Sequence, residues 1–173
     1  MVQIKTIHAR QILDSRGNPT VECEITFSSG QIGRGISPSG ASTGKLEAIE
    51  LRDNDKTKFN GKSVLKAVSN INSMIKKKII GCDFKNQKEF DDVLIELDGS
   101  DNKKNLGANA ILAASLAFCK AKSKYDGIEL FQSFGNNYSL PVPLMNILNG
   151  GAHANNKLDF QEFMIIPVEF PSF

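Results

Sequence analysis

The spacing of apolar residues changes once along this chain, and that change most constrains the fold. Across residues 20–28, apolar side chains alternate with polar ones from Val21 to Phe27, which is the period of a half-buried β-strand. Residues 2–13 and 31–36 have the same strand-like character, and turn-forming residues separate the three stretches. We therefore expect a three-stranded antiparallel meander in the N-terminal part.

From Gly61 onward the apolar residues follow a helical period. A first helix is expected to end at Gly81, and Asn86 with Glu89 resembles a capping box that opens a second helix. Residues 107–124 predict a third helix, whose many alanines permit close packing on a neighbouring element. Strands followed by helices indicate an α+β domain. The face of the first helix is formed by Val64, Val68, Ile71, Ile75 and Ile79.

A loop of small residues lies between the two patterns. Residues 37–44 contain two glycines, one proline and four hydroxyl residues, so the backbone is free to bend and several oxygens can face one ligand. A polar surface connection is the alternative interpretation. A phosphate-binding P-loop is excluded. Only three residues separate Gly40 from Gly44 where the motif needs four, and Leu46 stands where the motif needs a hydroxyl residue. Residues 46–53 have helical composition and are expected to form a helix.

Composition indicates a globular protein of a reducing compartment. The 173 residues are 40% hydrophobic and 23% charged, with a net charge of +2, which does not favour nucleic acid or a membrane as partner. No apolar run approaches the ~20 residues of a membrane span, and a signal peptide is not evident. Cys23, Cys82 and Cys119 are widely spaced, which argues against a disulfide framework or a zinc site. A cytoplasmic location is expected.

A second boundary is expected near two prolines, Pro141 and Pro143. Residues 143–170 predict a strand, a glycine-rich loop and a second strand. We therefore divide the chain into domains at residues 1–140 and 141–173. His153 lies in the glycine-rich loop, where a solvated side chain is the alternative to a functional one. His8 lies in the first strand pattern, where a structural role is favoured.

Several longer blocks of sequence occur in one order along the whole chain, and together they resemble the enolase family. The resemblance implies an N-terminal domain built as a meander with a helical layer, followed by the first strands of a truncated (β/α)8 barrel, which needs about 250 residues when complete. The blocks are residues 14–22, 38–44, 47–48, 50–53, 107–112, 146–153 and 161–164.

The same resemblance implies site residues and a reaction. Ser42 matches a loop serine that binds a second Mg²⁺, and a serine hydroxyl is a plausible ligand for that ion. His153 matches an active-site loop histidine that meets the substrate. Gln161 and Glu162 match positions that contact 2-phospho-D-glycerate, with Glu162 in the carboxylate network around the proton donor. Catalytic roles are thus expected for His153 and Glu162, although Glu162 alone could be an ordinary solvated carboxylate.

The implied activity is the Mg²⁺-dependent, reversible dehydration of 2-phospho-D-glycerate to phosphoenolpyruvate, a lyase reaction of glycolysis. The family's metal-binding carboxylates, base lysine and principal acid belong to the barrel, so the 173-residue chain alone is expected to be inactive. The alternative is a non-catalytic interaction module that keeps the N-terminal fold. Resemblance also implies a homodimer, with residues 10–22 as a candidate interface, and leaves room for a secondary cell-surface location.

Overall fold

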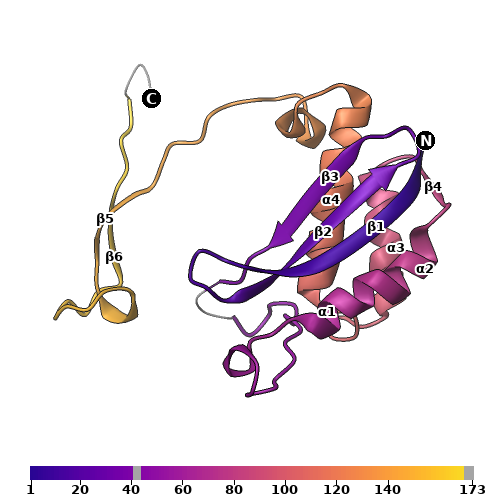
Figure 1. Cartoon of the computed structure of the whole chain (residues 1–173). Coiled ribbons are helices and arrows are strands. Elements are labelled where there is room, and N and C mark those ends of the chain that lie inside the picture. The colour runs from indigo at the N-terminus through magenta and orange to yellow at the C-terminus, as the bar shows by residue number, and fades with distance from the viewer. Residues whose placement is uncertain (41–43, 170–173) are drawn as a thin grey trace. The chain divides into compact units, whose positions relative to one another are not determined.

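The computed structural model describes residues 1–40 and 44–169, which form two compact units. The first unit runs from Met1 to Phe134 and the second from Gly135 to Phe173. Figure 1 shows the elements of both units.

A four-stranded antiparallel sheet forms one layer of the first unit. Its strands are β1 (Val2–Leu13), β2 (Pro19–Phe27), β3 (Ile32–Ser37) and β4 (Asp83–Phe84), in the order β3-β2-β1-β4. The first three strands pair as the predicted meander, so that prediction is confirmed. β4 was not expected, because two residues are too few to show a period; it pairs with the start of β1.

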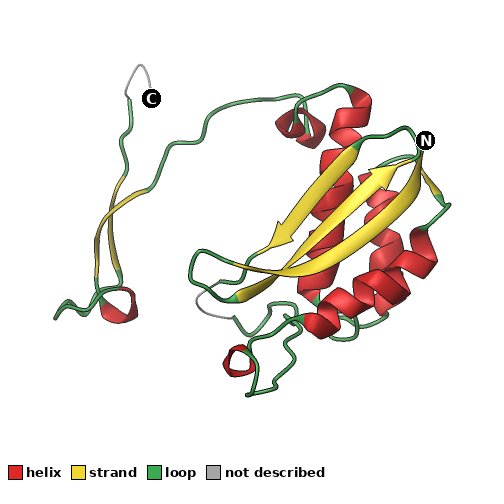
Figure 2. Cartoon of the chain, viewed as in Figure 1, coloured by secondary structure: helices red, strands yellow, loops and turns green. Residues whose placement is uncertain are grey.

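Helices cover one face of this sheet (Figure 2). α1 (Leu65–Asn70), a π-helical turn (Ile71–Ile75) and α2 (Lys76–Ile79) follow one another without a break. α3 (Gln87–Asp98) begins at Asn86, whose side chain accepts a hydrogen bond from the Glu89 N–H at 2.9 Å, as the capping pattern predicted. α4 (Ala108–Asp126) is the longest helix among the described residues. Short 3₁₀ turns lie at Phe59–Gly61 and Leu130–Phe134.

The core lies between sheet and helices, and α4 approaches β3 unusually closely. A Cβ atom added to Gly33 would lie 2.0 Å from the carbonyl oxygen of Ala117, and one added to Gly35 would lie 2.2 Å from that of Ala113. Only glycine on the strand and small residues on the helix permit this spacing. The close packing expected of the alanine-rich helix is confirmed.

The helix expected at residues 46–53 is absent, and that prediction was wrong. The segment is instead an extended strap whose backbone groups bond to distant parts of the unit. The Ile49 N–H donates to the carbonyl oxygen of Asn102 at 2.8 Å, and the Ala108 N–H donates to that of Ile49 at 2.8 Å. The Asn109 side chain bonds both backbone groups of Leu51, at 3.1 Å each. These tertiary hydrogen bonds replace the local ones that a helix would need.

The second unit contains an antiparallel hairpin. β5 (Met145–Asn149) pairs with β6 (Glu162–Ile165), and a 3₁₀ turn at Gly151–His153 lies in the connection between them. Strand, glycine-rich loop and strand thus occur in the predicted order. Every residue of β5 and β6 is exposed, so the hairpin has no core of its own among the described residues.

Candidate functional site

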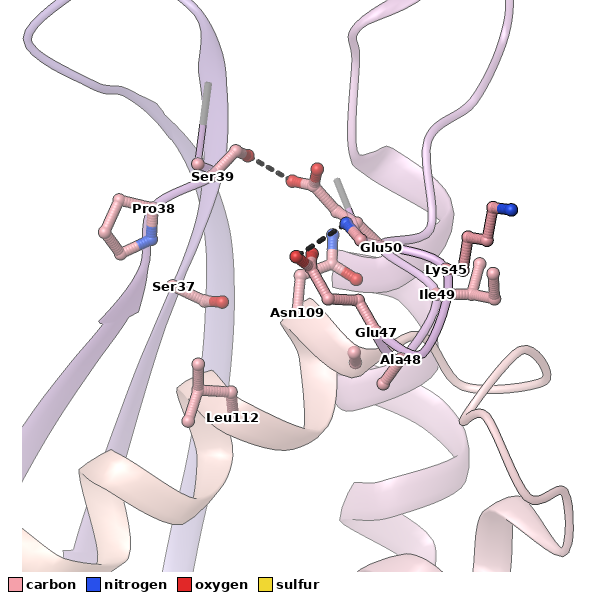
Figure 3. A pocket seen from close by; sticks show the side chains of 13 residues that line it. Ser37, Pro38, Ser39, Lys45, Glu47, Ala48, Ile49, Glu50, Asn109 and Leu112 are labelled. Atoms are coloured by element: carbon pink, nitrogen blue, oxygen red, sulfur yellow. Dashed lines mark hydrogen bonds between the residues drawn. The ribbon is translucent and has the colours of Figure 1, made fainter. Parts of the chain in front are cut away.

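Two parts of the chain carry the predicted site residues, one in each unit. Ser42 lies outside the described residues, but the residues on either side of its loop are described. The Ser39 hydroxyl donates a hydrogen bond to Glu50 and accepts one from Arg52 (Figure 3 shows the first). The Gly44 N–H donates to Glu47 Oε1 at 2.8 Å. Both flanks of the loop are therefore fastened to the strap at residues 46–53.

A hollow of about 490 Å³ lies beside these flanks. Its wall is formed by the end of β3, the strap and the first turns of α4 (Figure 3). Glu47 and Glu50 contribute carboxylates, yet each already bonds a loop flank. Their observed role is thus to hold the loop. The lining residues are Ser37, Pro38, Ser39, Gly40, Gly44, Lys45, Glu47, Ala48, Ile49, Glu50, Ala108, Asn109 and Leu112.

In the second unit the structure brings the other three predicted residues to one end of the hairpin. Asn149 is paired with Glu162, and the Gly150 N–H donates to the carbonyl oxygen of Gln161 at 2.9 Å. The His153 N–H donates to the carbonyl oxygen of Gly150 at 3.1 Å, which folds the turn back onto this end. The turn that carries His153 and the start of β6 are consequently neighbours.

This arrangement explains why polar residues precede β6 instead of following it. In (β/α)8 barrels the functional rim is at the carboxyl ends of the strands. Because β6 runs antiparallel to β5, its first residues lie at the carboxyl end of β5. Gln161 and Glu162 therefore occupy the same end as the residues that follow β5.

The side chains at this end are accessible. His153, Gln161 and Glu162 are all exposed, and none of the three side chains forms a hydrogen bond or ion pair within the part of the chain that the structure describes. The turn itself is tightly specified, since a Cβ atom on Gly150 would lie 2.3 Å from the carbonyl oxygen of Phe160. Only glycine fits the turn at position 150, and the polar side chains are accessible to a ligand.

Residues 1–40 and 44–169 contain no group of three or more acidic, histidine or cysteine side chains that could hold a metal ion. No helix in the same residues is long and apolar enough to cross a membrane. Burial raises the pKa of the Cys23 thiol to about 12, so this cysteine is a buried apolar residue and not a nucleophile.

Sequence reasoning missed Glu47, Glu50 and Arg52, although their segment was among the blocks that carried the resemblance. Composition predicted a helix for this segment and no role for these three side chains. The strap's role depends on contacts with β3 and α4, which no local pattern encodes.

Two family comparisons cover almost the whole chain. Residues 4–134 match the family described as "Enolase, N-terminal domain". Residues 137–173 match the family described as "Enolase, C-terminal TIM barrel domain".

Proposed function

The chain belongs to the enolase family, and from that premise we propose that it is the N-terminal part of an enzyme that reversibly dehydrates 2-phospho-D-glycerate to phosphoenolpyruvate. The observation that supports this best is the end of the hairpin. His153, Gln161 and Glu162, three residues that resemble substrate-contacting positions of the family, share that end with exposed side chains. The geometry of these residues does not select one ligand, so the reaction is inferred from the family.

The reaction is difficult because it adds a second negative charge to the carboxylate end of the substrate. Removing a proton from the carbon beside a carboxylate creates an ene-diolate, which this superfamily stabilises with one or two Mg²⁺ ions. In the proposal, His153 and Gln161 bind and orient the substrate. Glu162 belongs to the carboxylate network around the proton donor that assists loss of the hydroxyl group. We propose Ser42 as an additional oxygen ligand of Mg²⁺, with the carboxylate ligands supplied by the barrel.

In this proposal, most of that barrel is supplied by sequence beyond these 173 residues. A (β/α)8 barrel takes about 250 residues, whereas the barrel match here spans residues 137–173. The base lysine and the principal acid are proposed to come from that remainder. A cytoplasmic location and a homodimer that uses residues 10–22 are part of the same proposal. Glu22, within that segment, is buried and paired with Arg10 at 2.8 Å.

The test uses the longer protein that carries the rest of the barrel. Glu162→Gln should lower turnover by about 10²-fold or more, in the range expected for a group that takes part in general acid–base catalysis. His153→Ala should lower it by about 10²-fold through misplacement of the substrate. The melting temperature of each variant is measured alongside, and a loss of turnover at an unchanged melting temperature assigns the effect to the site. Lys157→Ala, an exposed residue of the same connection, is the control and should keep full turnover. Unchanged turnover in both site variants would show that the transferred roles are wrong.

A further inference from the structure

Arg52 joins four segments of the first unit at the base of the 38–44 loop. Its NH1 group donates to the carbonyl oxygen of Pro19 at 2.6 Å and to that of Lys62. Its NH2 group donates to the Ser39 hydroxyl and pairs with Glu50 Oε1 at 2.7 Å. A guanidinium presents its donors in a rigid fork, so one side chain can fix these partners relative to one another. The Arg52 side chain is only 18% exposed.

Ser39 closes the arrangement. It lies two residues beyond the end of β3, where pairing with β2 has stopped. Its hydroxyl accepts from Arg52 and donates to Glu50, while Glu50 and Arg52 also pair directly. Three side chains thus form a closed triangle, and one of them belongs to the loop. Charge-assisted hydrogen bonds of this kind are among the stronger ones in proteins.

We propose that Arg52 and Glu50 are positioning residues for the enolase reaction, acting through Ser39. They determine where residues 38–40 leave the sheet, at the start of the loop that carries Ser42. Neither side chain contacts substrate in this proposal. The inference rests on the proposed function, since it concerns how that reaction's loop is held.

The experiment measures steady-state kinetics of the longer protein with 2-phospho-D-glycerate. Arg52→Lys keeps the charge but loses the fork, so it cannot hold Ser39, Glu50 and the two carbonyl groups together. The expected result is a fall in kcat of about tenfold or more with KM changed by less than about threefold, because small misplacements of reacting groups are costly. Arg34→Lys is the control. Arg34 also pairs with a carboxylate, Glu22, and bonds no loop residue, so kcat should be preserved.

A double-mutant cycle shows whether the effect passes through Ser39. If it does, adding Ser39→Ala to Arg52→Lys should lower kcat little further than the worse single variant. Hydrogen exchange supplies a readout independent of activity: the hydrogen-bonded amides of Leu51 and Asp53, on either side of residue 52, should exchange faster in Arg52→Lys, and those of α4 away from Asn109 should not change.

Normal kcat and unchanged exchange in Arg52→Lys would overturn the inference, as would additive effects in the cycle. If Arg52→Lys does not fold, Glu50→Gln replaces it with the same expected results. An inactive wild-type longer protein would instead contradict the proposed function, so the two failures are distinguishable.

Discussion

Asp98, at the scale of single residues, makes the stability of the first unit sensitive to acid. Burial by itself would raise the pKa of this carboxyl, but hydrogen bonds from the backbone N–H of Leu106 and from Ser100 outweigh it and lower the pKa below its ordinary value. The carboxylate is therefore favoured in the folded state. Its contribution is complete above the ordinary pKa of about 3.9 and is lost as the pH falls through the lowered folded value.

Asp98→Asn should accordingly lower the unfolding free energy at neutral pH by about 1–3 kcal/mol, because buried backbone donors lose a charged acceptor. Between about pH 5 and pH 2 its stability should fall less with acid than that of the wild type. Urea titrations at several pH values measure both effects. Equal pH slopes for the two proteins would show that Asp98 does not carry this sensitivity.

Residues such as Asp98 mark a limit of prediction from sequence. The stretch from Asp98 to Asn102 indicates a helix end, and α3 does end there. The bonding partner of this carboxylate is set by a chain reversal. It brings the Leu106 N–H to Asp98 Oδ2, with a nitrogen-to-oxygen distance of 2.7 Å. The identities of His153, Gln161 and Glu162 came from resemblance, and their roles remain predictions.

At the scale of elements, the spacing of apolar residues predicted the main strands and helices of the first unit. It missed the strap, whose path is held by tertiary hydrogen bonds. In the first unit the predicted meander and the helices with an apolar face formed, because burying that face is their main source of stability. The strap at residues 46–53 has the composition of a helix, yet Leu46 and Ile49 are exposed. Leu51 packs against the core, and the strap is held in its extended path by backbone bonds to Asn102, Ala108 and Asn109.

The contact between β3 and α4 should tolerate no added methyl group. Gly33→Ala and Gly35→Ala should each destabilise the chain by about 1–3 kcal/mol or more, as overpacked cores do. Thermal or urea unfolding measures the loss. Combining Gly33→Ala with Ala121→Gly tests the cause: the clash is chiefly with the backbone of Ala117, so removing the Ala121 methyl should not restore stability. Full rescue would place the clash in the side chain instead.

Position 150 in the hairpin should likewise not accept an added methyl group. A Cβ atom there would meet the carbonyl oxygen of Phe160 at 2.3 Å and displace the turn that carries His153. Gly150→Ala in the longer protein should therefore lower turnover by about 10²-fold through misplacement of that turn. Wild-type turnover in this variant would show that the turn's geometry does not matter for the reaction.

At the scale of the whole molecule, the two units differ in how they bury apolar surface. The first has a sheet, a helical layer and a core in which Phe27, Phe90 and Phe118 are fully buried. The second is a two-stranded hairpin, and such hairpins are marginally stable alone. In the 173-residue chain, amides of β5 and β6 should thus exchange with solvent much faster than those of α4. Equal protection in a hydrogen-exchange experiment would contradict this.

The central claim is that this chain supplies accessory groups to a reaction whose base, principal acid and metal carboxylates lie in the rest of the barrel. Its most direct test measures the absorbance of phosphoenolpyruvate formed from 2-phospho-D-glycerate and Mg²⁺, with the purified 173-residue chain and the longer protein side by side. We expect turnover by the longer protein and none by the 173-residue chain. Turnover by the shorter chain near that of the longer one would contradict it.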